Sequence, residues 1–204
     1  MPGGIVVIGA SWGGLQALTT LVSGFQANFP FPLVVVQHRS RDSTSALAEL
    51  LQDVSKLKVC EVEDKAPIVD GHVHIAPPDY HLLVDSGSFS LSTEAPLRYS
   101  RPSIDITFES VALAYNELAI GVVLTGANQD GAEGLRTIVA RRGIAIVQEP
   151  DTAESPTMPR AALKAVPTAK VLPIDEMAAY LTRLAVKRQP ESRANQAPSL
   201  GRSP

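Results

Sequence analysis

The sequence has a single cysteine, no excess of basic residues and no long apolar run, and each absence excludes a class of protein. Because Cys60 stands alone, an internal disulfide and a thiolate-rich metal site are both excluded. The formal net charge of −3 argues against a surface for nucleic acid or an anionic membrane, since either needs a concentrated basic face. No stretch is long enough to span a bilayer, and Met1 leads into an apolar strand pattern without the regions of a signal peptide. We therefore expect a soluble, cytoplasmic protein.

The length and composition suit one domain. A chain of 204 residues with 45% hydrophobic residues can form one sizeable α/β domain and a short tail, but not comfortably two domains. We expect the domain to occupy residues 1–187. Residues 188–204 are rich in Pro, Ser, Arg and Asn, which predicts a disordered tail or linker.

Short β-branched runs alternate with helical patterns, which is typical of a parallel sheet covered on both faces. The expected fold is α/β, with a doubly wound, mostly parallel sheet and helices on both faces in a three-layer α/β/α arrangement. The strands expected in this sheet are residues 5–8, 33–37, 58–62, 119–124, 144–147 and 170–172. The expected helices are residues 15–22, 44–54, 103–116, 131–141, 159–165 and 174–187, with Asp42 or Ser43 as the start signal of the second.

The rhythm changes between residues 70 and 92. Three short runs, 72–75, 81–84 and 89–92, are separated by turn-forming residues such as Pro77-Pro78-Asp79 and Asp85-Ser86-Gly87. This pattern predicts a small antiparallel hairpin excursion from the main sheet.

A candidate nucleophile stands at the end of the first expected strand. The run Ile5-Val6-Val7-Ile8-Gly9-Ala10-Ser11-Trp12-Gly13-Gly14 passes from a buried-strand pattern through a glycine-flanked serine into a helical pattern. Small residues around Ser11 allow a sharp turn there, and the N–H groups of the helix beginning near Leu15 lie where they can stabilise an oxyanion. The run therefore predicts a serine hydrolase, which needs a base and an acid.

Two further strand ends supply them. In an open doubly wound sheet, functional groups gather at the carboxyl ends of the strands. The second strand ends at His38, and the strand at 119–124 leads through a loop to Asp130. His38 would take the proton of Ser11 and pass it to the leaving group, while Asp130 would orient the ring. Each residue also has a structural interpretation, as a tight turn, a strand-end histidine and a helix N-cap, but their coincidence at neighbouring strand ends favours a catalytic triad.

Two other classes of function compete with the hydrolase. A dinucleotide site would need Gly-x-Gly-x-x-Gly, but Ser11 stands where the second glycine belongs, and the second strand ends in Gln37-His38 instead of an acidic ribose ligand. A metal hydrolase would use His72, His74, Asp79 and His81, whose spacing matches no tight metal motif. We expect neither a cofactor nor a metal.

Several sequence blocks resemble one family in order and spacing. They cover most of residues 4–185 and are Ile5 to Gly14, Gln37-His38, Gly71 to His81, Arg101-Pro102-Ser103-Ile104-Asp105, Leu124 to Ala132 and Met158-Pro159-Arg160-Ala161. Together they resemble the catalytic domain of the CheB-type chemotaxis receptor methylesterases. The resemblance implies hydrolysis of glutamate methyl esters on the cytoplasmic helices of methyl-accepting chemoreceptors, release of methanol, and deamidation of receptor glutamines. It places the family's triad on Ser11, His38 and Asp130. From the charge and the lack of a long apolar run we expect no nucleic-acid partner and no direct membrane insertion.

The sequence departs from the family pattern beside the nucleophile and before the acid. The family usually has a small or hydroxylated residue after the serine, whereas Trp12 stands here. The family loop commonly runs Gly-Met-Gly-x-Asp-Gly, and Ala127-Asn128-Gln129 replaces its centre. We expect the backbone N–H groups of Trp12 and Ala127 to serve as oxyanion donors. The unusual indole also keeps open a catalytically weakened family member that binds receptors without hydrolysing them.

Many family members carry a receiver domain before the esterase. Met1 precedes the first strand by only a few residues, so no receiver domain is expected within this chain. Arg101 and Arg160 are candidates for contact with an acidic receptor surface, or are simply exposed charges.

Overall fold

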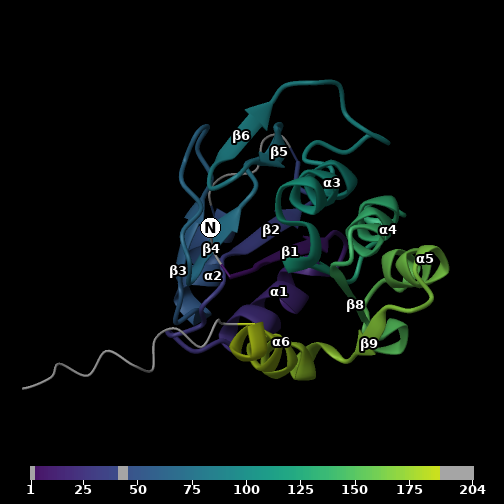
Figure 1. The fold of residues 1–204 in the computed structure, drawn as a ribbon. Helices are drawn as coiled ribbons and strands as arrows, with labels where there is room; N and C mark the ends of the chain where they lie inside the picture. The colour runs from purple at the N-terminus through teal and green to yellow at the C-terminus, as the bar shows by residue number, and fades with distance from the viewer. Residues whose placement is uncertain (1–2, 41–45, 189–204) are drawn as a thin grey trace, which may run out of the picture.

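The structure, a computed structural model, describes residues 3–40 and 46–188 and arranges them in three layers (Figure 1). The central layer is a seven-stranded parallel sheet with the order β3-β4-β2-β1-β7-β8-β9. Its strands are β1 Ile5–Ala10, β2 Leu33–Gln37, β3 Lys58–Glu61, β4 His72–Ile75, β7 Ala119–Val123, β8 Ile144–Gln148 and β9 Lys170–Leu172. The predicted α/β class and parallel sheet are confirmed.

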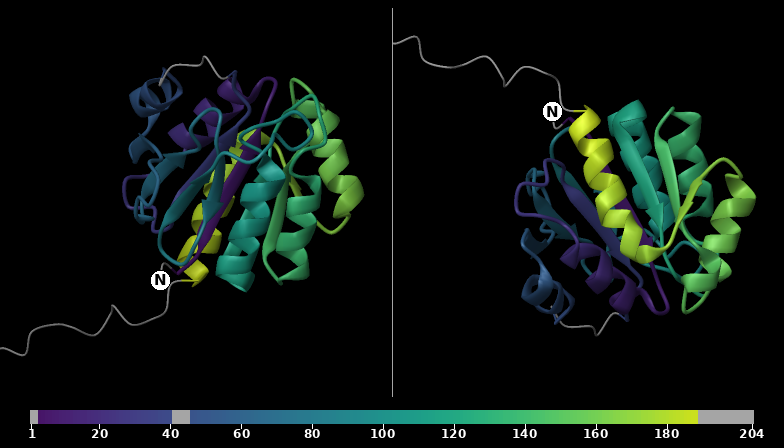
Figure 2. Two further views of the ribbon diagram at one scale, coloured as in Figure 1. Left: turned by 90° about the horizontal axis from the view of Figure 1, so that it is seen from above. Right: turned by 90° about the horizontal axis from the view of Figure 1, so that it is seen from below.

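Helices cover both faces of the sheet, because successive strand residues point to opposite sides. Val6 and Ile8 of β1 share one buried cluster with residues of α1, α2 and α6, while Ile5 and Val7 share the other with residues of α3, α4 and α5. Figure 2 shows the two helical layers from above and below. The helices are α1 Gly14–Ser23, α2 Ala46–Val54, α3 Ile104–Tyr115, α4 Ala132–Ala140, α5 Thr157–Ala165 and α6 Ile174–Arg188, with short 3-10 turns η1 Asn116–Leu118 and η2 Pro150–Thr152.

The prediction for residues 72–75 was wrong. These residues form β4, which lies between β3 and β2 in the parallel sheet. Only β5 (His81–Val84) and β6 (Phe89–Ser92) form the antiparallel hairpin. Phe89 of the hairpin packs on the His74 ring at a centroid distance of 4.9 Å. The hairpin therefore covers part of the sheet face on which a helix would otherwise lie. Because no helical pattern follows β4 in the sequence, the alternation of strands and helices did not reveal that β4 belongs to the parallel sheet.

The limits of the remaining elements lie within two residues of the predicted ones wherever the structure describes both ends. The predicted start of the second helix at Thr44, with its candidate start signals, falls in residues 41–45, outside the described residues. The tail predicted over 188–204 lies outside them from residue 189 onward. Among the helices of the described ranges, none has the length and apolar character that crossing a membrane requires.

The strand order sets the place of the site. β1 pairs with β2 on one side and with β7 on the other, so the chain reverses its direction of travel across the sheet at β1. In doubly wound sheets a crevice opens at such a switch point, outside the carboxyl ends of the strands. The loops after β1, β2 and β7 meet there, and these are the loops that carry Ser11, His38 and Asp130.

Candidate active site

Ser11 lies in a sharp turn between β1 and α1. Its N–H donates to Thr125 O at 3.0 Å, and its carbonyl oxygen accepts from Gly14 N at 2.9 Å. Gly13 has a φ of +75°, a conformation that favours glycine. A Cβ on Gly14 would meet the Gln37 amide and would lie 2.9 Å from Ala10 Cβ, so a larger residue there would displace its neighbours. The turn has the predicted form, but the N–H of Gly14 is bonded within it and is not an oxyanion donor.

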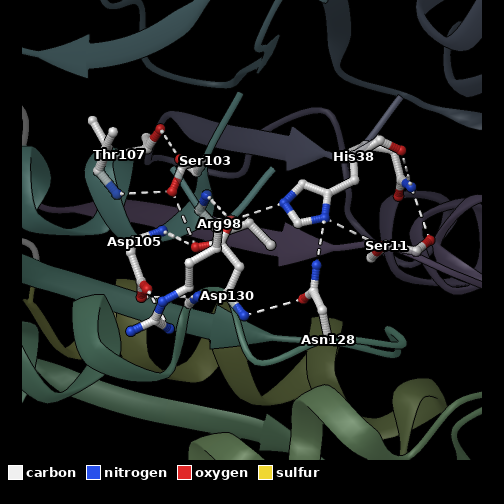
Figure 3. A network of polar contacts seen from close by, with 12 residues as sticks. Ser11, His38, Arg98, Ser103, Asp105, Thr107, Asn128 and Asp130 are labelled. Atoms are coloured by element: carbon white, nitrogen blue, oxygen red, sulfur yellow. Dashed lines mark hydrogen bonds and ion pairs between the residues drawn. The ribbon is translucent and has the colours of Figure 1, made fainter. Parts of the chain in front are cut away.

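His38 follows β2 and joins the serine to the acid (Figure 3). Its Nδ1 lies 3.2 Å from Ser11 Oγ, and its Nε2 lies 2.8 Å from Asp130 Oδ2. Gln37 Nε2 donates to Ser11 O at 2.8 Å and to His38 O at 3.0 Å, which ties the two loops together. Gln37 therefore holds the nucleophile loop, at the position where a dinucleotide site would need an acidic ribose ligand.

Asp130 is buried and accepts hydrogen bonds on both carboxylate oxygens. Oδ1 accepts from Ser103 Oγ at 3.0 Å and Asp105 N at 2.9 Å, and Oδ2 accepts from Ile104 N at 2.7 Å in addition to His38. The carboxylate thus sits on the N-terminus of α3, where backbone N–H groups favour a negative charge. Burial by itself would raise the pKa of Asp130, but the bonds from His38 and from these N–H groups outweigh it and lower the pKa. Asp130 is therefore ionised at neutral pH and can orient the imidazole.

Asp105 is a second buried carboxylate behind Asp130. Its Oδ1 accepts from Gly131 N and Gly134 N, both at 2.8 Å, and its Oδ2 lies 3.5 Å from Arg98. Burial raises the pKa of Asp105 to about 6, assisted by the charge of Asp130 and opposed by the Gly134 hydrogen bond and Arg98. These contacts hold the start of α4 against α3, so Asp105 supports the loop that carries the acid.

A groove of about 540 Å³ opens beside the nucleophile, lined by residues that include Ser11, Trp12, Leu15 and Ala127. Trp12 lines this groove and is 66% exposed. Within the described residues, the N–H groups of Trp12 and Ala127 have no hydrogen-bond acceptor. Two free N–H groups beside a serine hydroxyl are the donors that a developing oxyanion needs.

The histidines outside this site have structural partners. His72 Nδ1 lies 3.0 Å from Asp70 O, and His81 lies between Ser103 N and Ala95 O at 3.2 and 3.1 Å. Burial lowers the pKa of His74 to about 4, so this ring is neutral. In the part of the chain that the structure describes, no group of three His, Cys, Asp or Glu side chains is placed to hold a metal ion.

Two contacts of the site were missed by the sequence interpretation. Asn128 lies between the base and the acid loop, with Nδ2 3.2 Å from His38 Nδ1 and Oδ1 3.1 Å from Asp130 N. Ser103 bonds the Asp130 carboxylate while it caps α3. The signals were present, since Asn-x-Asp is a turn-forming spacing and Ser103 precedes a predicted helix, but neither pattern identifies its distant partner.

Arg101 and Arg160 differ in their surroundings. Arg101 donates to Asp79 Oδ1 at 3.0 and 2.6 Å and to the carbonyl oxygens of Thr93 and Glu94, so its guanidinium fixes the loop before α3. Arg160 is exposed on α5.

Comparisons with known proteins agree on one family. The family model described as CheB methylesterase matches residues 6–181. A putative protein-glutamate methylesterase/protein-glutamine glutaminase of Leptospira interrogans serogroup Icterohaemorrhagiae serovar copenhageni is 41% identical over 180 residues, which are 88% of this chain and 93% of the relative. A protein-glutamate methylesterase/protein-glutamine glutaminase of Anaeromyxobacter dehalogenans is 40% identical over 88% of this chain, but the match spans only 53% of that longer relative. The crystal structure of the Thermotoga maritima CheB methylesterase catalytic domain superposes with a TM-score of 0.86 and 34% identity, over 90% of this chain and 100% of that one.

Proposed function

The chain belongs to the CheB methylesterase family, and on that premise we propose that it hydrolyses methyl esters of glutamate side chains on chemoreceptors and deamidates receptor glutamines. The catalytic domain would comprise residues 1–187. The observation that carries the proposal is the unbroken contact chain from Ser11 Oγ through the His38 ring to the Asp130 carboxylate, at 3.2 and 2.8 Å. Nucleophile, base and orienting acid within hydrogen-bond reach are the requirement for acyl transfer by a serine enzyme.

The first step is acylation of the serine. Ser11 Oγ attacks the ester carbonyl while His38 Nδ1 takes the hydroxyl proton, and the N–H groups of Trp12 and Ala127 bind the oxyanion. When the tetrahedral intermediate collapses, the C–O bond to the methoxy group breaks and His38 returns the proton to it, so methanol leaves. The imidazolium present between these events is stabilised by ionised Asp130.

The second step is hydrolysis of the acyl-enzyme. Water adds to the acyl carbonyl as His38 Nδ1 takes a proton from it, and the ester bond to Ser11 then breaks with return of that proton to Oγ. Each turnover converts one ester and one water into one carboxylic acid and one methanol. A glutamine substrate follows the same route, with ammonia as the leaving group.

The substrate side of the proposal rests on the open form of the groove. A methoxy group is small and needs no deep pocket, so specificity comes from docking the receptor around the reacting side chain. Trp12 and Leu15 are 66% and 45% exposed along the groove, and they offer apolar contact area to a receptor helix. Since the substrate helices are the cytoplasmic parts of chemoreceptors, the protein would act in the cytoplasm.

The decisive experiment uses a receptor cytoplasmic fragment carrying methylated glutamates. The wild-type protein should release methanol, and Ser11→Ala should lower turnover by about a million-fold, as removal of a triad nucleophile does. His38→Ala should have a comparable effect, while Lys187→Ala, at an exposed position near the end of α6, is the control that should keep full activity. A fully active Ser11→Ala protein would refute the mechanism.

A second candidate function follows from Trp12. An exposed indole directly after the nucleophile also suits a protein that binds receptors without hydrolysing them. One protein preparation distinguishes the two functions. Binding of the receptor fragment without release of methanol would establish the second function and exclude the first.

A further inference from the structure

Asn128 contacts both the base and the backbone of the acid. Its Oδ1 lies 3.1 Å from Asp130 N, and its Nδ2 lies 3.2 Å from His38 Nδ1 (Figure 3). The N–H of Asp130 can only donate, so the oxygen of the amide must face it. The amide orientation is thereby fixed, and the NH₂ group is the part of Asn128 that faces the imidazole.

This orientation determines where the proton of the neutral imidazole resides. Nδ1 faces an N–H donor and must therefore act as an acceptor. Nε2 faces Asp130 Oδ2, which can only accept because the carboxylate is ionised, so Nε2 carries the proton. Both contacts select the same tautomer. In this tautomer the single lone pair of Nδ1 is an acceptor that lies within reach of both the Asn128 amide and Ser11 Oγ, each at 3.2 Å.

Ser11 cannot make this selection, because a hydroxyl group can donate to Nδ1 or accept from it. Asp130 holds one side of the ring, and among the residues that the structure describes only Asn128 supplies an unambiguous donor to Nδ1. We propose that Asn128 is a positioning residue that selects the tautomer of His38 with an unprotonated Nδ1 beside Ser11, through the N–H···N bond from its amide. The inference deepens the proposed esterase function and rests on it for its catalytic consequence.

The bond also responds to the reaction itself. When Nδ1 takes the serine proton, it becomes a donor that faces the donor of Asn128, and the bond is lost. Asn128 therefore favours the return of that proton from Nδ1 to the leaving group. The amide is half-buried, which limits the competition from water for these groups.

An isosteric substitution separates this role from a purely structural one. Asn128→Asp keeps the oxygen that accepts from Asp130 N–H, so a residue that only holds the turn would tolerate it. The second carboxylate oxygen would replace the donor with an acceptor and pull a proton onto Nδ1. Gln129→Glu adds the same charge at the adjacent, exposed position and serves as the matched control.

The test is ¹⁵N NMR of the four histidine rings in weakly alkaline buffer, with the His38 signals assigned by a His38→Gln variant. The wild-type spectrum should show Nε2 protonated and Nδ1 unprotonated with a hydrogen bond to its lone pair. Asn128→Asp should show protonation at both nitrogens, and Asn128→Ala should move the Nδ1 signal toward that of an unbonded lone pair. Gln129→Glu should match the wild type.

Turnover on the methylated receptor fragment provides the second readout. Asn128→Asp should lower kcat on the order of 10²- to 10⁴-fold with KM changed less than about twofold, because the base is lost while docking is retained. A neutral His38 and normal kcat in Asn128→Asp would overturn the proposal, as would an unchanged Nδ1 signal in Asn128→Ala if the aspartate variant did not fold. Since the NMR result does not depend on esterase activity, a failure of the proposed function would be recognised separately.

Discussion

Replacing Asp105 by asparagine should make the protein more stable relative to the wild type as the pH rises. Asp105 is 2% exposed, and burial raises its pKa to about 6. The pKa of an aspartate in the unfolded chain is about 3.9. The native state thus binds this proton more tightly than the unfolded state. The stabilisation associated with the proton is fully present below about pH 4 and is lost as the pH rises through about 6.

The magnitude follows from the difference between the two states. A separation of about two pKa units corresponds to about 3 kcal/mol, at 1.36 kcal/mol per unit. Asparagine does not titrate, and its oxygen can still accept from the N–H groups of Gly131 and Gly134. The unfolding free energy of Asp105→Asn minus that of the wild type should therefore rise by on the order of 3 kcal/mol between pH 4 and pH 8. Asp130 has the opposite dependence, but it is present in both proteins and largely cancels.

The assay is urea unfolding followed by far-UV circular dichroism at several pH values, because the exposed Trp12 is a poor reporter of unfolding. Asp53→Asn, at an exposed position of α2, is the control, and its difference from the wild type should stay nearly constant. A difference for Asp105→Asn that stays flat, or that falls with rising pH, would refute the argument that ionised Asp105 is destabilising.

Three further predictions concern the groups around the triad. Asp130→Asn removes the charge that α3 and His38 both bind. It should lower the free energy of unfolding in urea by about 2–4 kcal/mol and lower kcat by about 10⁴-fold, and near-normal activity would contradict this. Ser103→Ala should lower stability by about 1 kcal/mol through loss of the α3 cap, and an unchanged unfolding midpoint would argue against that role. Trp12→Thr should raise KM about 5- to 30-fold with little effect on kcat, and equal KM values for the variant and the wild type would show that Trp12 does not contact the receptor. In an inactive Ser11→Ala protein, the fluorescence emission of this single tryptophan should shift when the receptor fragment binds.

The sequence was sufficient to predict that Ser11, His38 and Asp130 lie together, because parallel sheets constrain where loops meet. Once β1, β2 and β7 were recognised as parallel strands, the residues that follow them had to lie at the same edge. The turn at Ser11 was predictable for a local reason, since Gly13 and Gly14 satisfy a backbone angle and a close contact that larger residues would not.

The orientation of the triad was not predictable. Whether Nδ1 or Nε2 of His38 faces Ser11 depends on side-chain geometry that no spacing rule contains. The same is true of Asn128, whose role depends on the direction of one amide. The run 72–75 was assigned to the hairpin because it is short and a turn-forming segment separates it from 81–84, whereas it pairs in parallel with β2 and β3.

Asp130 takes part both in the packing of the fold and in the contacts of the candidate site. The N–H groups at the start of α3 hold its carboxylate ionised before any substrate arrives, so His38 does not have to supply that stabilisation alone. The nucleophile loop is held separately, because Thr125 accepts from Ser11 N–H through its carbonyl and donates to Trp12 O at 2.9 Å through its hydroxyl. Asp130 and Ser11 are therefore each anchored to backbone that α3 and the sheet already fix. In the proposed mechanism, the groups that would take the Ser11 proton and stabilise the imidazolium are thus already in place before a substrate binds, so the reaction would not have to order them.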